Sequence, residues 1–491
     1  MDALPAGAVF LETSLSGPEQ VDYSGRRVTV MGLGRFGGGL GAVQFLINRG
    51  ARVRVTDLRS PEDLAETLAL LDLPRLETLA LGSHPEHLFT DADLVVVNPA
   101  VRRDHPRLEL ARQHGIPLTS EMNLFWTHQP GRIIGVTGSN GKSTTTALIH
   151  HLLQQAGNRV WLGGNLGGSL LPHVNEIAPA DWVVLELSSF MLADLDHLRA
   201  SPHLAVVTSF APNHLDWHPD LADYRRAKQT ILRWQSQADF AVLNADDPDV
   251  RTWPTPAEIR WFGESTLPGP GTQVVGKTLE LQMPEGASRF DLATGFSLPG
   301  RHNRWNAAAA VSAARALGVS DEQIRAGLAT FQGLPHRLQL VAEGKGRRFY
   351  NDSLATTPES ALCALEAFDA QVLLLAGGYD KQVDLTAFAQ GISERAKGVT
   401  LLGQTAPRLE ELLDQVGARL PRHRATSLAD AFQWAVDQTA EGDVVLLSPA
   451  CASFDWFKNF ADRGQQFTGL AREWCAAEPD GERHRFSTQL P

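Results

Sequence analysis

Cysteines and long apolar runs are both scarce in this sequence, and each scarcity excludes a class of protein. The 491 residues contain only three cysteines, and Cys363, Cys451 and Cys475 lie far apart without forming a CxxC pair. An odd, scattered set of this kind predicts reduced thiols in a cytoplasmic protein. No apolar run approaches the roughly 18 residues of a membrane span, and the N-terminus lacks the basic and apolar regions of a secretory signal.

Positive charge is also in short supply. Lysine and arginine number 44 against 56 aspartates and glutamates, which gives a net charge of −12. Nucleic acids and membrane surfaces attract a basic face, so we expect neither as a partner. An anionic ligand would have to be held by a few well-placed cations or backbone N–H groups.

The chain has ample length and a recurring pattern. At roughly 150 residues per domain, it is long enough for about three domains. A short apolar strand, a glycine turn and a helical segment recur along the chain, which predicts α/β domains, each an open and mainly parallel sheet with helices. The stretches "THQPGR" and "FQGLPHR" divide the chain into 1–129, 130–333 and 334–491. Residues 265–288 are rich in Gly and Pro and predict small β elements or a surface insertion.

The stretch "GVTGSNGKSTT" joins an apolar strand to a predicted helix and is suited to hold phosphate. Backbone N–H groups of a glycine turn and the positive end of the helix favour an anion. Lys142 adds a charge for β- and γ-phosphates, and the hydroxyl of Ser143 or Thr144 can reach Mg²⁺. The spacing departs from G-x-x-x-x-G-K, because Val136 stands where the first glycine would be. A plain strand–helix turn is the alternative to this nucleotide site.

A second glycine-rich loop, Gly32-Leu33-Gly34-Arg35-Phe36-Gly37, follows the first apolar strand. Asp57 ends the next strand about 20 residues later, as in a dinucleotide-binding fingerprint. By itself this pattern predicts a nicotinamide-linked oxidoreductase, or only close packing of helix on strand. A UDP-sugar also carries a pyrophosphate and a ribose, so the pattern predicts a pyrophosphate site without choosing its ligand.

Polar side chains follow later strands of the middle third. Glu186 ends the strand in "VVLELSSF" and is either a Mg²⁺ ligand or a surface glutamate. "NHLDWH" brings His214, Asp216 and His218 together, but no further Cys or His cluster supports the zinc site that this spacing suggests. His214 is better suited to phosphate or Mg²⁺. Lys228, on a predicted helix, has a surface lysine as its ordinary interpretation.

Further polar residues stand at the start of a helix before residue 333 and, in the last third, at the ends of several strands. Asn303, in "GRHNRWN", could contact adenine or phosphate, or could cap the helix. Four further clusters together suit a small dicarboxylate or closure on ATP; they contribute Arg337, Asp352, Thr356, Lys381, Ser453 and Lys458.

The order of these motifs resembles the Mur ligases. TGSNGKST, LELSSF, NHLDWH, YRRAK, HNRWN, LPHR, NDS and GGYDK precede SPACASFDWFKNFADRG, which is the most specific of them. The resemblance covers almost the whole chain and is nearest to the branch that adds glutamate to UDP-N-acetylmuramoyl-L-alanine. It implies an ATP- and Mg²⁺-dependent amide ligase that adds D-glutamate through an acyl phosphate. It also implies a cytoplasmic monomer acting in peptidoglycan precursor synthesis.

The resemblance assigns roles to individual residues. It implies a Rossmann-like first domain for UDP, a P-loop ATPase-like central domain and a Rossmann-like last domain for glutamate. Lys142, Glu186, His214 and Lys228 would be catalytic. Mg²⁺ would be held by Ser143, Glu186, His214 and Lys228, the last if carbamylated. ATP would contact Gly138, Asn140, Gly141, Lys142, Ser143, Thr144, Asn303, Arg337 and Asp352. The UDP-substrate would contact Gly34, Arg35, Asp57, Arg59, Gly82, Ser83 and Asn165. Glutamate would contact Thr356, Lys381, Ser453 and Phe460.

One stretch departs from the family. Where Mur ligases of this branch usually read D-S-K-A-T-N, this chain has Leu354 at the lysine position and Thr357 at the asparagine position. A related branch adds L-glutamate and depends on a separate epimerase, so this enantiomer is the alternative to D-glutamate. A ligase acting on folate or another peptide, an oxidoreductase, and a nucleotide-gated binding protein without bond-forming chemistry are further alternatives.

Overall fold

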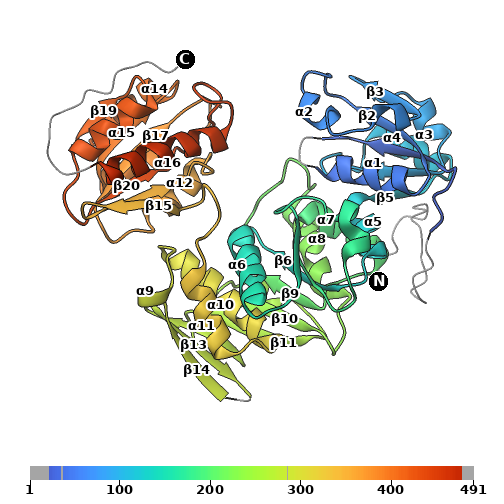
Figure 1. Ribbon diagram of the computed structural model, residues 1–491, viewed down its shortest axis with the longest axis horizontal. Coiled ribbons are helices and arrows are strands. Elements are labelled where there is room, and N and C mark those ends of the chain that lie inside the picture. The colour runs from blue at the N-terminus through green and yellow to red at the C-terminus, as the bar shows by residue number, and fades with distance from the viewer. Residues whose placement is uncertain (1–20, 35–36, 285, 478–491) are drawn as a thin grey trace. The chain divides into compact units, whose positions relative to one another are not determined.

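The computed structural model describes residues 21–34, 37–284 and 286–477. Its strands form three sheets, coloured in sequence order from blue through green to red in Figure 1. Helices follow most of the parallel strands, because a parallel strand can be reached only by a crossover connection. The predicted three-domain α/β class is therefore confirmed.

The first sheet has the strand order β3-β2-β1-β4-β5, and all of its neighbours pair in parallel. Its strands are β1 (Arg27–Met31), β2 (Arg52–Asp57), β3 (Thr78–Leu81), β4 (Leu94–Val97) and β5 (Leu118–Ser120). Its helices are α1 (Gly38–Asn48), α2 (Ala65–Leu68), η1 (Leu73–Arg75), α3 (His87–Thr90), α4 (Pro106–Gln113) and α5 (Glu121–His128). Side chains of α1 and α5 cover one face, and those of α3 and α4 the other. The strand order reverses between β1 and β4, where open sheets of this kind bind ligands.

The second sheet runs β14-β13-β12-β11-β10-β9-β6-β8-β7. Its strands are β6 (Arg132–Thr137), β7 (Val160–Gly164), β8 (Trp182–Glu186), β9 (Leu204–Val207), β10 (Phe240–Asn244), β11 (Glu258–Gly263), β12 (Gly271–Val275), β13 (Thr278–Met283) and β14 (Gly286–Asp291). Its helices are α6 (Lys142–Gln155), η2 (Leu171–Glu176), α7 (Ser189–Leu195), η3 (Asp196–Leu198), α8 (Leu221–Arg233), η4 (Val250–Thr252), α9 (Leu292–Gly295), α10 (Arg301–Ala316) and α11 (Asp321–Thr330). Strands β12 to β14 pair antiparallel, so the Gly- and Pro-rich stretch does form β structure, as an extension of this sheet.

The third sheet runs β15-β16-β20-β17-β18-β19 and is parallel except where β15 meets β16. Its strands are β15 (Gln339–Gly344), β16 (Arg347–Asn351), β17 (Val372–Gly377), β18 (Ala396–Leu402), β19 (Arg422–Arg424) and β20 (Val444–Leu447). Its helices are α12 (Pro358–Leu365), α13 (Thr386–Arg395), α14 (Ala406–Gln415), α15 (Leu428–Asp437) and α16 (Phe460–Ala476). Strands β17 and β20 are buried along their whole length, because α12 to α14 pack on one face and α15 and α16 on the other.

The chain divides into two compact units. The first ends at Gly295 and also takes in Arg304–Thr330, and the second holds Phe296–Asn303 and the chain from Phe331 onward. The first two sheets share a unit because one continuous apolar core joins them, in which Phe125 of α5 belongs with Leu171 of η2. No helix within the described residues is both long and apolar enough to cross a membrane.

Candidate active site

The predicted phosphate loop lies at the carboxyl end of β6, between that strand and α6. Gly138 has φ 150° and Gly141 has φ 82°, and both are in close contact with other groups. A Cβ at Gly138 would lie 1.9 Å from Thr208 Oγ1, and one at Gly141 would lie 2.5 Å from Asn306 Oδ1. Because both the backbone angle and the space exclude a side chain, these two glycines are required for the loop's shape.

The rest of the loop is held by hydrogen bonds to the end of β9. The amide of Asn140 donates to Ser209 Oγ at 3.0 Å, and Ser139 N donates to Ser209 O at 2.8 Å. Lys142 opens α6, and its Nζ donates to Ser139 O at 3.1 Å. Ser143 is partly exposed beside it and Thr144 is buried. The loop thus presents a helix N-terminus and a lysine at one sheet edge, as an anion site requires.

Glu186 ends β8 and is buried, with a side chain that has one satisfied and one unsatisfied oxygen. Asn165 Nδ2 donates to Glu186 Oε1 at 3.1 Å, and Asn165 N donates to the Glu186 carbonyl at 2.9 Å. Within the described residues, Glu186 Oε2 has no hydrogen-bond partner. A buried carboxylate oxygen left unpaired is costly unless a cation or donor meets it, so the residues fit a Mg²⁺ ion.

Lys228, on α8, is not a surface lysine: its side chain is 2% exposed. Its Nζ donates to the Gly138 carbonyl at 2.8 Å and to Thr137 Oγ1 at 3.3 Å, directly beneath the phosphate loop. Burial and the nearby charge of Lys142 lower the pKa of Lys228 well below its usual range, and the charge of Glu186 partly opposes them. The ordinary interpretation of this lysine is therefore wrong, because α8 turns it inward toward the loop.

His214 lies on an exposed turn between β9 and α8 with φ 54°. Desolvation of its ring, together with the positive charges of Lys142 and Lys228, lowers the pKa of His214. His218, in contrast, is buried and structural: its Nδ1 is 2.7 Å from Asp223 Oδ2 and its Nε2 is 2.9 Å from Ser189 Oγ. Among the described residues there is no cluster of three or more His, Cys, Asp and Glu able to hold a metal.

The second glycine loop lies at the carboxyl end of β1, beside the ends of β2 and β3. Gly34 N donates to Asp57 Oδ2 at 3.1 Å, and Arg59 N donates to Asp57 Oδ1 at 2.9 Å. Gly82 N donates to the Arg59 carbonyl at 3.1 Å, and the Ser83 carbonyl accepts from Thr56 Oγ1 at 2.8 Å. The structure thus brings four of the predicted UDP contacts together: Gly34, Asp57, Arg59 and Gly82, with Ser83 adjacent. Arg35 lies outside the described residues.

In the second compact unit, the buried carboxylate of Asp352 links two loops through hydrogen bonds. Its Oδ2 accepts from Ser448 Oγ at 2.7 Å, and its Oδ1 accepts from Leu338 N at 3.0 Å. Burial raises the pKa of Asp352 to about 7, while these two hydrogen bonds and the charge of Arg337 lower it. Asn303 Nδ2 donates to the Pro299 carbonyl at 2.7 Å.

The loops predicted to bind glutamate meet around a residue that the sequence did not single out. Arg463 of α16 is fully buried, and its guanidinium donates to the Ser353, Cys451 and Ala452 carbonyls and to Ser353 Oγ at 2.9 to 3.3 Å. Ser353 Oγ in turn donates to the Phe460 carbonyl at 2.8 Å. Burial lowers the pKa of Arg463 to about 10, so the group remains charged near neutral pH.

The remaining predicted glutamate contacts differ in exposure. Ser453 is buried next to Ala452, Thr356 is half-buried, and Lys381 is exposed. Leu354, at the position where the family has lysine, is 37% exposed. Thr357 caps the start of α12 by accepting a hydrogen bond from Ser360 N at 3.4 Å, a role that asparagine could fill equally well.

Comparison with known proteins assigns each sheet to a described domain. The Mur ligase MurD-like N-terminal domain matches residues 26–120, the Mur ligase middle domain 136–314, and the Mur ligase glutamate ligase domain 336–451. A protein of Koribacter versatilis named UDP-N-acetylmuramoylalanine–D-glutamate ligase is 37% identical over 460 residues, covering 93% of this chain and all of the relative. A protein of the same name from Roseiflexus sp. is 41% identical over 471 residues, covering 92% of this chain and all of the relative.

Solved structures share the fold at lower identity. UDP-N-acetylmuramate-alanine ligase MurC of Thermotoga maritima superposes with a TM-score of 0.58 at 20% identity, over 91% of this chain and all of that one. MurF of Acinetobacter baumannii superposes with a TM-score of 0.56 at 17% identity, over 91% of this chain and 93% of that one. The family read from the motifs is thus confirmed by sequence along nearly the whole chain, and the chain belongs to the Mur ligase family.

Proposed function

We propose that this protein joins D-glutamate to UDP-N-acetylmuramoyl-L-alanine, with cleavage of ATP to ADP and phosphate. The observation that carries the proposal is the group of Lys142, Lys228 and Glu186 at the carboxyl ends of β6 and β8, beside the phosphate loop. The names of the two relatives above support the substrate and the enantiomer. L-glutamate remains the alternative, and it would require a separate epimerase.

The chemistry follows from what an amide bond needs. A carboxylate is a poor acyl donor, so the γ-phosphoryl group of ATP is transferred to the alanyl carboxylate to give an acyl phosphate. The loop from Gly138 to Thr144 and Lys142 would orient the phosphates and neutralise their charge. The glutamate amine then attacks the acyl carbon, a tetrahedral oxyanion forms, and phosphate leaves as the amide bond is completed.

A magnesium ion would be held by Glu186, with Ser143, His214 and Lys228 as further candidates. When bound, it would supply neutralising charge at the phosphate oxygens. Mg²⁺ usually needs only one or two carboxylates when phosphates provide its other ligands, which agrees with the single unpaired oxygen of Glu186.

Lys228 is suited to carbamylation. Its lowered pKa favours the neutral amine, which can add to CO₂ and release one proton to give a carbamate. The product carries a negative charge in place of a positive one. The carbamate nitrogen keeps one N–H, so only one of the two hydrogen bonds that Nζ makes to Gly138 and Thr137 could persist.

The other assignments are proposals from the resemblance. Asn140, Asn303, Arg337 and Asp352 would contact ATP. Asn165 would contact the pyrophosphate of the UDP-substrate, and Thr356, Lys381, Ser453 and Phe460 would bind glutamate. We also propose the domain bounds 1–129, 130–333 and 334–491, and a monomer in the cytoplasm.

The test is release of phosphate from ATP in the presence of UDP-N-acetylmuramoyl-L-alanine and either glutamate enantiomer. We expect release with D-glutamate and none when either substrate is omitted. Release with L-glutamate alone would favour the alternative and would make the altered stretch at Leu354 a specificity device. Binding of ATP without substrate-dependent release would favour the nucleotide-gated binding protein instead.

A further inference from the structure

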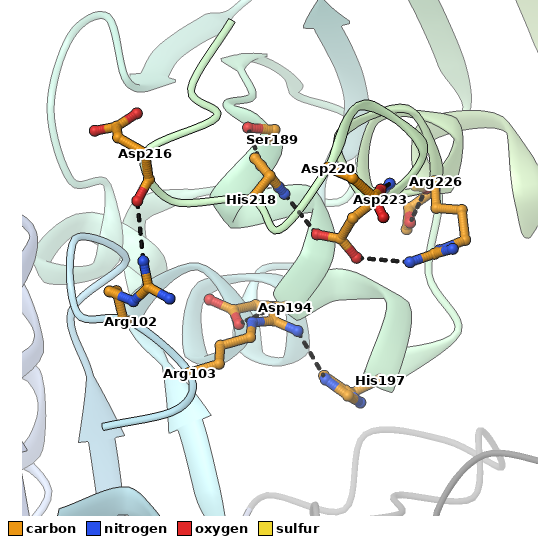
Figure 2. Close-up of polar contacts among 11 residues, drawn as sticks. Arg102, Arg103, Ser189, Asp194, His197, Asp216, His218, Asp220, Asp223 and Arg226 are labelled. Carbon is orange, nitrogen blue, oxygen red and sulfur yellow. Dashed lines mark hydrogen bonds and ion pairs between the residues drawn. The ribbon is translucent and has the colours of Figure 1, made fainter. Parts of the chain in front are cut away.

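Two arginines in the loop that follows β4 contact the residues next to the His214 turn. Arg102 and Arg103 follow β4, and Figure 2 shows them directed at residues that belong to the second sheet. Arg102 Nη1 donates to the Asp216 carbonyl at 3.0 Å. The Arg103 guanidinium lies 5.8 Å from the ring centre of Trp217. The function proposed above gives neither arginine a role.

Arg103 also holds the helix that packs behind this loop. Its Nη2 is 2.5 Å from Asp194 Oδ1 at the end of α7, and its Nη1 is 3.4 Å from His197 Nε2 (Figure 2). The Asp194 carbonyl accepts a further hydrogen bond from Asn123 Nδ2 of α5 at 3.1 Å. One end of α7 therefore receives contacts from two separate segments of the first sheet.

The position of His214 depends on the residues that these arginines touch. The His214 carbonyl accepts hydrogen bonds from the amides of Trp217 at 3.1 Å and His218 at 2.9 Å. The ring of Phe190 packs against His214 and Trp217, with centroid distances of 5.1 and 4.7 Å. Holding residues 216 to 218 in place therefore holds the His214 turn.

The segment that carries the two arginines begins at Asn98, which contacts the glycine loop that follows β1. Asn98 Nδ2 donates to the Gly32 carbonyl at 3.1 Å, and Asn98 Oδ1 accepts from Ala100 N at 3.0 Å. A Cβ at Gly32 would lie 2.8 Å from Asn98 Cβ, so the two backbones are in close contact. The segment from Asn98 to Asp104 thus connects the pyrophosphate loop to the His214 turn.

We propose that Arg103, assisted by Arg102, is a positioning residue that fixes the His214 turn relative to the substrate bound on the first sheet. The proposal rests on the proposed function for what is bound and on the contacts above for the connection. Arginine suits the role because its planar fork can meet Asp194, His197 and an aromatic face at once, whereas lysine is a single point charge. Energetic coupling between two sites can be carried by packed side chains and hydrogen bonds of this kind.

The first experiment measures hydrogen exchange in the ligand-free protein and needs no turnover. Arg103→Met is compared with Arg233→Met, since Arg233 pairs with Asp196 at 2.7 Å and has a similar side-chain exposure of 34% against 37%. Arg233 lies on α8 and Asp196 on η3, and both elements connect strands of the second sheet, so this pair does not involve the first sheet. We expect the amides of Trp217 and His218 to exchange about tenfold faster in Arg103→Met and unchanged in the control. Unchanged exchange in Arg103→Met would overturn the proposal.

The second experiment separates positioning from general stability. In Arg103→Met we expect kcat to fall about tenfold while the KM for ATP stays within about twofold and the melting temperature matches that of Arg233→Met. Arg103→Lys should recover part of kcat. If Arg103→Met has a lower melting temperature than Arg233→Met but an unchanged kcat, then Arg103 is merely structural and the proposal is overturned. If the wild type shows no substrate-dependent phosphate release, the proposed function fails, and the exchange measurement still decides the positioning role.

Discussion

At the scale of single residues, Lys228 offers the sharpest test of chemistry. If its carbamate is the working group, Lys228→Ala should lower turnover about 100- to 1,000-fold, because a charge beside the transferring phosphoryl group is lost. Short carboxylic acids such as acetate should then restore a part of the activity by occupying the vacated space. Phosphate release measured with and without added acid checks this.

The matched control for acid rescue is Lys397→Ala. Lys397 pairs with Asp443 at 2.6 Å, and neither residue belongs to the predicted site. Added acid should leave its turnover unchanged. If no acid restores the turnover of Lys228→Ala, then Lys228 acts as an unmodified ammonium group or through its packing.

Glu121 carries a second residue-scale prediction, on stability against pH. The carboxyl at the start of α5 accepts a hydrogen bond from Ser169 Oγ, and burial raises its pKa to about 7 from 4.5. The folded protein therefore binds this proton more tightly than the unfolded chain. The resulting stabilisation is complete below about pH 4.5 and is lost as the pH rises through about 7, with a total of about 3 kcal/mol.

Glu121→Gln removes this titration while keeping an oxygen for Ser169. We expect its melting temperature, relative to wild type, to rise between about pH 5 and pH 8, because only the wild type loses stabilisation there. Glu109→Gln, on α4 at an exposed position, provides the comparison for the loss of one surface carboxylate. A constant difference between Glu121→Gln and wild type would contradict the assigned cause.

At the scale of elements, α16 holds together the loops that we predict to bind glutamate, through the hydrogen bonds of Arg463. Arg463→Met would leave the Ser353, Cys451 and Ala452 carbonyls without their donor, at a cost of about 3 kcal/mol in the free energy of unfolding. We expect the KM for glutamate to rise at least about tenfold while the KM for the UDP-substrate is unchanged. Arg463→Lys should be intermediate, since it keeps the charge but loses the fork.

Steady-state kinetics with each substrate varied in turn checks the α16 prediction. Arg395→Met is the control, because Arg395 pairs with Glu366 at 3.6 Å on the surface of the same sheet's helices. Equal increases in all three KM values would show that Arg463 supports the unit as a whole and not the glutamate loops in particular.

Local sequence was sufficient for elements that depend on their own residues. The apolar run from Ile133 predicts a strand, and the segment from Lys142 predicts a helix, as the structure has them. The two glycines between them predict a turn, and both have positive φ in the structure. The helix Arg301–Ala316 likewise follows from its alanine run and ends before Gly318, which has φ 83°. The Gly- and Pro-rich stretch was predicted as small β elements or a surface insertion, because its pairing with β11 depends on a partner strand elsewhere in the chain.

At the scale of the whole molecule, the two glycine loops follow strands of different sheets, β1 and β6. We therefore expect the loss of one loop's ligand to leave binding at the other loop unchanged. Lys142→Met should lower turnover about 100- to 1,000-fold because the phosphate charge is no longer neutralised. Binding of UDP-N-acetylmuramoyl-L-alanine, measured by calorimetry, should be unchanged, since Gly34 and Asp57 are untouched. A loss of this binding would contradict the assignment of UDP to the first sheet.

The sequence by itself determined the fold class and the family, and it predicted which loops could carry chemistry. Motifs such as the Gly-Lys-Ser loop and the SPACASFDWFKNFADRG stretch are local in the chain, and their backbone needs can be read from glycine, lysine and strand periodicity. The residues singled out at strand ends, including Glu186 and Asp57, do meet their neighbours there, because parallel strands place their carboxyl ends at one sheet edge.

Only the tertiary structure decided which of the polar residues are buried and what they touch. Lys228 and Arg463 look like ordinary helix-surface cations in sequence, yet both are buried. Lys228 donates to the Gly138 carbonyl and the Thr137 hydroxyl, and Arg463 donates to three backbone carbonyls. The bond from Arg103 to Asp194 joins positions 91 apart in the chain. Burial and long-range pairing depend on the packing of whole sheets and helices, so no local pattern could have revealed these contacts or the pKa shifts that follow from them.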